Sequence, residues 1–287
     1  METPPGNSVR RHDIDWLRVI LFGLLIWFHY AVFSLGQLEG EKSSMEVFNL
    51  PLFFIISVMH QWRLAALFVI SGMGTAFAFR RRTWQMYVTE RGTRLGIPLL
   101  FGTYILWMGI FSPIDTTQRL FSIFPGSESM PYGHLWFIYN LLIYSLLLTP
   151  LFVYVKNHPD GNLIRFIRSL LQIRYGLGIL LLPPLILAMN GILFKPWEFG
   201  EVGMWWEFPR YFLYFLFGYL MISAKEEYFT VIDKVRIPVT VLTPILAIVW
   251  FISGDVIGIP QVMEGGWVHK GHPAFSLGAT FATFLQS

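Results

Sequence analysis

Arg18 and His29 are the basic residues of an apolar stretch that runs from Trp16 to Leu35, and both can do chemistry. Since an α-helix turns about 100° per residue, a spacing of eleven positions brings the two side chains to one helical face, about 16 Å apart along the axis. A neutral imidazole can take a proton from a hydroxyl, and a guanidinium can bind an anion. Ionisable groups inside an apolar helix usually face a protein interior or a wet cavity, so the pair predicts a pathway or a reaction site.

Both residues also have a structural interpretation. A histidine within a span can hydrogen-bond between helices, and Arg18 can extend to lipid phosphates while its stem stays in the apolar layer. Asp13 and Asp15 lie close enough in sequence to pair either with Arg18 or with Arg10 and Arg11. The shared face of Arg18 and His29 favours the functional interpretation of the histidine.

Further candidates lie later in the chain. Arg91 and Arg94 are three residues apart, which predicts one helical face where two guanidiniums can bind a phosphorylated ligand. The alternative is the basic flank that the cytoplasmic end of a span often carries. Ser71 stands in a run of small residues, which indicates close helix packing or, in the alternative, a substrate contact. His134 and Trp136 stand at the start of a later apolar stretch. They belong either to the site of His29 or to an aromatic belt at the membrane interface.

The composition is typical of a membrane protein. Of the 287 residues, 54% are hydrophobic and 14% are charged, whereas soluble domains are about one quarter charged. The mean hydropathy is +0.54. The sequence holds no cysteine, which excludes disulfides, thiolate catalysis and cysteine metal sites.

The apolar runs predict an all-α, polytopic transmembrane helical bundle with about seven complete spans and a partial eighth that begins near Pro273. A cytoplasmic leader at 1–12 is expected to precede one transmembrane domain at 13–287, which stops inside a helix. The complete spans are predicted at 15–35, 62–79, 95–112, 134–155, 176–193, 208–223 and 237–253. The segments predicted between them include an interfacial piece at 50–60, a polar loop at 83–93 and a surface helix at 162–173.

Lysines and arginines set the expected orientation. Most of the 21 fall on the side of the N-terminus, which places that terminus in the cytoplasm. Arg18 then lies at the cytoplasmic mouth and His29 in the outer half of the bilayer, while Arg63 counts among the few outer-side charges. No small-residue cleavage site accompanies the first span, so we expect it to stay as an anchor.

Several function classes have no signal in the sequence. There is no His-Glu-x-x-His zinc motif and no Gly-x-x-x-x-Gly-Lys-Ser/Thr phosphate loop. We predict no metal site. We also predict no nucleic-acid partner, because membrane topology accounts for the arginines.

Four stretches together resemble the acyltransferase-3 family of bacterial integral-membrane O-acyltransferases. The resemblance is greatest to its glucan-biosynthesis protein C-like (glucan succinyltransferase-like) branch. The stretches are Asp13-Ile-Asp-Trp-Leu-Arg18 through His29, Trp62-Arg63 leading into Leu67-Phe-Val-Ile-Ser-Gly72, Arg91-Gly-Thr-Arg94 with Ile97-Pro98, and Gly133-His-Leu-Trp-Phe137. The family usually has more spans than this chain, so the resemblance implies a C-terminally truncated sequence.

The resemblance implies transfer of an acetyl or succinyl group from cytoplasmic acyl-CoA to a hydroxyl of an extracytoplasmic glycan. It implies His29 as the catalytic base with Arg18 as its motif partner, and Arg91 and Arg94 as contacts of the acyl donor. Acyl-CoA enters as a substrate, and no tightly bound cofactor is expected. The expected location is the bacterial inner membrane, as a multi-pass protein among lipids. The alternatives are a transporter or flippase that uses the same polar path, and a non-catalytic remnant.

Overall fold

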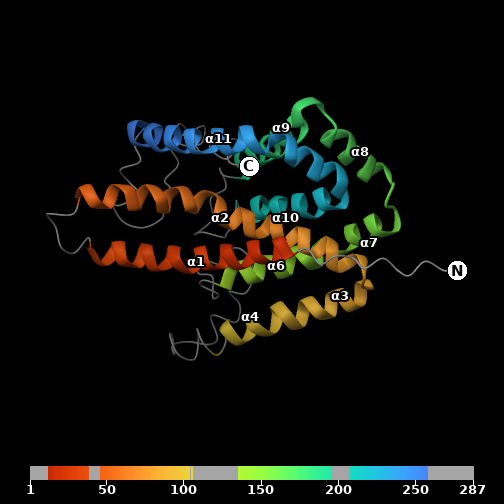
Figure 1. Ribbon diagram of the computed structural model, residues 1–287. Coiled ribbons are helices and arrows are strands. Elements are labelled where there is room, and N and C mark those ends of the chain that lie inside the picture. Colours follow the sequence, from red (N-terminus) through yellow and green to blue (C-terminus); the bar gives the residue numbers. More distant parts are fainter. Residues whose placement is uncertain (1–11, 39–45, 104, 106–134, 195–206, 258–287) are drawn as a thin grey trace.

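The computed structural model describes residues 12–38, 46–103, 105, 135–194 and 207–257, and every regular element among them is a helix (Figure 1). The prediction of an all-α fold is therefore confirmed for this part of the chain. The elements are α1 (His12–Leu38), α2 (Glu46–Arg80), α3 (Trp84–Arg91), the π-helix η1 (Gly92–Gly96), α4 (Ile97–Phe101), α6 (Trp136–Leu147), α7 (Thr149–Asn157), α8 (Asn162–Leu171), the 3-10 helix η5 (Arg174–Gly176), α9 (Leu177–Phe194), α10 (Glu207–Ser223) and α11 (Lys225–Ile257).

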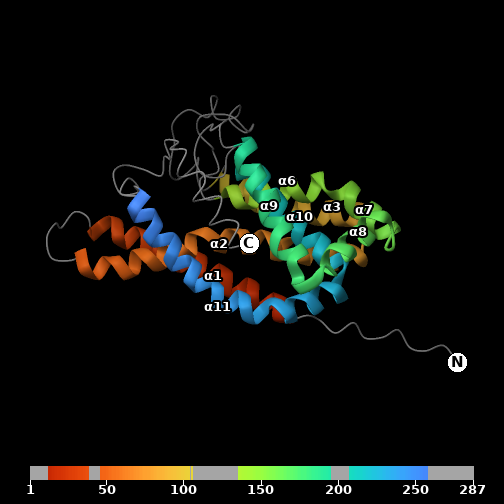
Figure 2. The same cartoon turned by 90° about the horizontal axis from the view of Figure 1, so that it is seen from above.

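Helix α2 is the centre of the bundle, with α1 along one side and α10 along another (Figure 1). Helix α11 runs obliquely to α2 in the view of Figure 2. Aromatic side chains fill the space between α2, α6 and α10. Phe68 is fully buried, with its ring centroid 4.7 Å from that of Phe137 and 4.9 Å from that of Tyr211. Offset and edge-on aromatic pairs of this kind add to the stabilisation from burial.

Two glycines bring α2 and α10 into backbone contact. A Cβ at Gly72 would overlap the carbonyl oxygen of Phe215, and a Cβ at Gly218 would overlap the carbonyl oxygen of Val69. Small residues at a helix interface allow this approach. The packing role predicted for the small residues of α2 is therefore confirmed at Gly72.

One helical segment among the described residues is long and apolar enough to cross a membrane, Trp62–Arg80, which coincides with the span predicted at 62–79. Helices α6 and α7 pass the same test as a pair, bent by 46° around Leu148. Pro150 lies in the first turn of α7, where its missing amide hydrogen costs little, although proline disfavours helical geometry in the residue before it. The count of seven spans remains a prediction.

The structure corrects three expectations about the connections. The polar loop predicted at 83–93 is wrong, because Thr83 caps α3 by accepting a hydrogen bond from the backbone amide of Met86 at 3.3 Å, and Tyr87 anchors that helix in the core. The interfacial piece predicted at 50–60 is continuous with α2 rather than separate. The span predicted at 237–253 is part of a longer helix, since α11 already begins at Lys225 and ends at Ile257.

The surface helix predicted at 162–173 is present as α8, whose buried side chains are Ile164 and Leu171. Arg168 of α8 donates to Asp160 at 2.7 Å and pairs with Glu227 of α11 at 3.3 Å. The hydrogen bond to Asp160 and the nearby carboxylates raise the pKa of Arg168. The leader at 1–12, except for His12, and the partial eighth span lie outside the described residues.

Candidate functional site

Arg18 points from α1 to the middle of α2. Its Nη2 donates a hydrogen bond to the backbone carbonyl of Ile70 at 3.2 Å. The guanidinium lies directly over Gly74, where a Cβ would overlap Nη2. A glycine one helical turn beyond Ile70 therefore makes the space in which this cation sits.

His29 lies on α1 at the edge of its buried face. Leu21, Phe28 and Ala31 are buried, whereas the imidazole is exposed. Its Nδ1 lies 2.8 Å from the carbonyl oxygen of Leu25, one turn earlier. Because a carbonyl oxygen only accepts, Nδ1 carries the hydrogen in neutral His29, and Nε2 holds the lone pair that a general base uses.

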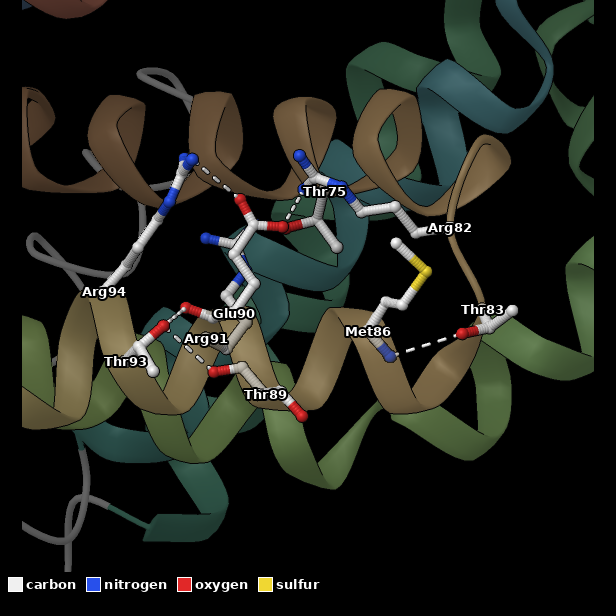
Figure 3. A network of polar contacts seen from close by, with 9 residues as sticks. All are labelled: Thr75, Arg82, Thr83, Met86, Thr89, Glu90, Arg91, Thr93 and Arg94. Carbon is white, nitrogen blue, oxygen red and sulfur yellow. Dashed lines mark hydrogen bonds and ion pairs between the residues drawn. The ribbon is translucent and has the colours of Figure 1, made fainter.

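Arg91 reaches α2 from the end of α3 (Figure 3). Its Nη2 donates to Thr75 Oγ1 at 2.9 Å, and its Cζ lies 5.1 Å from the ring centroid of Tyr87. Thr75 is fully buried and immediately follows Gly74. Arg18 and Arg91 therefore approach one stretch of α2, Ile70–Thr75, from two different helices.

Arg94 has a different partner from Arg91, so the two arginines of the Arg-x-x-Arg stretch are directed to different protein groups. It pairs with Glu90 at 3.0 Å, and its side chain is 73% exposed. Glu90 also pairs with Arg82 at the end of the α2–α3 turn (Figure 3). Arg91 precedes the π-helix η1, and Arg94 lies inside it, where i→i+5 hydrogen bonds widen the turn. A spacing of three residues across such a turn does not keep the one-face geometry of an α-helix.

The remaining predicted residues fall in different places. Trp136 is half-buried, 5.3 Å from the ring of Tyr211, and forms part of the aromatic core. Ser71 is half-buried on α2 within the stretch that Arg18 and Arg91 approach. His134 lies outside the described residues. Among the residues that the structure does describe, no group of three or more His, Cys, Asp or Glu could hold a metal ion.

Sequence reasoning missed two residues of this region. It counted Arg63 as an outer-side charge, but the side chain is 2% exposed inside the bundle. It gave Thr75 no role, although this hydroxyl accepts from Arg91. An arginine one residue inside a long apolar run was the available signal for Arg63, whereas the Thr75 contact depends on how α3 folds back on α2.

Comparison with known proteins identifies the family of this chain. The family model Acyl_transf_3, described as an acyltransferase domain, matches residues 11–285. The chain belongs to this acyltransferase family.

Among curated proteins, "Glucans biosynthesis protein C" of Escherichia coli strain K12 is 24% identical over 167 residues. The alignment covers 55% of this chain and 43% of that protein. The protein of the same name from Escherichia coli O1:K1 / APEC matches with the same identity and coverage. The aligned region thus spans less than half the length of these relatives. No solved structure matches the chain.

Proposed function

We propose that this protein is a multi-pass membrane O-acyltransferase of the bacterial inner membrane. It moves an acetyl or succinyl group from cytoplasmic acyl-CoA to a hydroxyl of an extracytoplasmic glycan. The family supports the acyltransferase class, and the relatives' name supports a glucan as acceptor. Large apolar side chains exposed on the described helices, such as Ile26 at 73% and Ile237 at 68%, support a lipid environment.

The observation that carries the proposal is the convergence of Arg18 and Arg91 on the Ile70–Thr75 stretch of α2. Two cations from different helices at one level of the bundle suit a ligand with several phosphates, and guanidinium binds phosphate in a planar, bidentate geometry. We assign Arg18 and Arg91 to the nucleotide end of acyl-CoA. The side chain of Arg94 is more exposed, and we assign it to the initial binding of acyl-CoA.

The chemistry takes place eleven residues further along α1, at His29. Its Nε2 accepts the proton of the glycan hydroxyl while the hydroxyl oxygen forms a bond to the thioester carbonyl carbon. The carbon–sulfur bond then breaks, and the imidazolium returns its proton to the sulfur. The products are the acylated sugar and the free thiol of CoA, and His29 is neutral again.

His29 and Arg18 are separated by about 16 Å along the helix axis. This separation lets the anionic part of the donor stay at the arginine end while the thioester reaches the imidazole. Ser71, His134 and Trp136 are assigned to the walls of the acyl and acceptor sites. Neither a metal nor a tightly bound cofactor takes part.

Acyl transfer by the purified protein tests this function. The protein is reconstituted in lipid nanodiscs with isotopically labelled acetyl-CoA or succinyl-CoA and a soluble glucan, and the glucan is analysed by mass spectrometry. The proposal predicts a protein-dependent mass increase that matches an added ester. A transporter or flippase would move substrate across liposomes without any covalent change, and a non-catalytic remnant would give neither result.

A further inference from the structure

Arg63 of α2 is a buried cation with unused hydrogen-bond donors. The residue is 2% exposed, and neither Nε nor Nη1 has a hydrogen-bond partner in the described part of the chain. Burial of a guanidinium removes its hydration, and a charge without a polar partner does not recover that free energy. A buried guanidinium with unpaired donors therefore destabilises the fold unless another group accepts hydrogen bonds from it.

Its position links Arg63 to His29. The Cζ atom lies 3.4 Å from the ring centroid of Phe28, which is itself buried, and the ring of Phe28 lies 5.6 Å from that of His29. A cation–π contact uses the flat face of the guanidinium. The N–H groups lie in the plane of the guanidinium, so this contact leaves them able to donate to a ligand.

Arg63 also differs from the other cations of the site. Nη2 of Arg18 and Nη2 of Arg91 each donate to a protein oxygen, of Ile70 and Thr75 respectively. Arg63 lies seven residues before Ile70, about 10 Å further along α2, at the level of Phe28. It is therefore separate from the donor-binding arginines and belongs to the histidine end of the site.

We propose that Arg63 is the anion-binding residue of the acyl site, with Nε–H and Nη1–H donating to a negatively charged oxygen of the acyl group beside His29. This inference rests on the proposed acyl transfer. Two oxygens have this chemistry: the oxyanion that forms on the thioester carbonyl during attack, and the terminal carboxylate of a dicarboxylic acyl group. Either would supply an acceptor for the two donors, Nε and Nη1, that have no hydrogen-bond partner among the described residues.

The test compares Arg63→Met with Arg81→Met, which removes an exposed arginine just beyond the end of α2. Both variants are assayed with acetyl-CoA and with succinyl-CoA. Loss of a hydrogen-bond donor to the oxyanion typically lowers kcat by about 100-fold or more. If Arg63 binds the oxyanion, kcat should therefore fall equally with acetyl-CoA and with succinyl-CoA. A carboxylate role predicts a raised KM and slow transfer with succinyl-CoA alone. Arg81→Met should leave both rates unchanged.

Heat stability separates this role from a structural one. Because Arg63→Met replaces a buried charge, two of whose donors have no partner among the described residues, by an apolar side chain, the variant should unfold at the same temperature as the wild type or higher. Unchanged transfer in Arg63→Met, or a fall in its unfolding temperature that accounts for the lost activity, would overturn the proposal. A wild-type protein without any transfer would refute the acyltransferase function instead, and the unfolding temperatures would still decide whether Arg63 is structural.

Discussion

The guanidinium of Arg18 occupies the space that any side chain at Gly74 would need. The contact joins α1 to α2 at the level where Thr75 meets Arg91. The absence of a side chain at Gly74 therefore decides whether Arg18, a cation of the proposed donor site, can reach the bundle interior. This relationship, rather than the spacing of Arg18 and His29 alone, ties the first helix to the rest of the site.

Gly74→Ala should displace Arg18 without unfolding the protein. The methyl group would overlap the far end of a flexible side chain, which can move, so we expect little loss of stability. Arg18 would lose its hydrogen bond to Ile70, and the KM for acyl-CoA should rise. A charged hydrogen bond contributes about 1.5–3 kcal/mol, which corresponds to roughly a tenfold or greater change. Steady-state kinetics with varied acyl-CoA measures this effect.

Gly23→Ala on α1 is the matched control for Gly74→Ala, because a Cβ there would meet nothing within 4 Å. Its kinetics should equal those of the wild type. Equal KM values for Gly74→Ala and Gly23→Ala would show that Arg18 does not contribute to the binding of acyl-CoA.

Gly72→Ala should behave differently, since its Cβ would overlap backbone rather than a flexible side chain. Helices α2 and α10 must then separate, and overpacking of this kind costs about 1–3 kcal/mol. We expect a lower unfolding temperature in detergent, with activity lost in proportion to the folded fraction. Gly218→Ala at the facing position should give the same result. A Gly72→Ala variant as stable as the wild type would show that the two backbones are not in contact.

The fold was partly predictable for identifiable reasons. Apolar runs predicted the helices that include α10 and the Trp62–Arg80 segment, because their length and hydropathy do not depend on neighbours. Helix α3 was missed because Trp84–Arg91 has little apolar character, and its stability comes from the Thr83 cap and from Tyr87, which packs against Phe79 and Phe152. These are tertiary contacts that a pattern cannot show.

The candidate site was predictable to a similar degree. The Arg18–His29 spacing indicated a shared face, but the edge position of His29 depends on where Leu21 and Phe28 pack. Burial of Arg63 depends on the ring of Phe28 from another helix, so its charge alone suggested only a position on the outer side. The divergence of Arg91 and Arg94 follows from η1, whose π-helical turn has no simple sequence signal.

Thr75→Val tests the anchoring of Arg91. The substitution keeps the shape of a fully buried side chain but removes the oxygen that accepts from Arg91 Nη2. We expect the KM for acyl-CoA to rise roughly tenfold, since the lost bond involves a charged donor, while kcat changes little. Thr75→Ser keeps the hydroxyl and should retain near-normal affinity. If Thr75→Val bound acyl-CoA normally, the hydrogen bond between Arg91 and Thr75 would have no role in donor binding.

The proposed base at His29 is the centre of this account, and His158 provides a matched control. His158 is also exposed, and its Nδ1 lies 3.0 Å from the carbonyl of Tyr154, four residues earlier, as His29 does with Leu25. The decisive measurement is the acyl-transfer rate of His29→Asn beside His158→Asn, with the unfolding temperature of each. We predict that His29→Asn folds normally and loses about 100- to 10,000-fold in kcat, whereas His158→Asn is unchanged. A His29→Asn protein that transfers acyl groups at the wild-type rate would contradict the account.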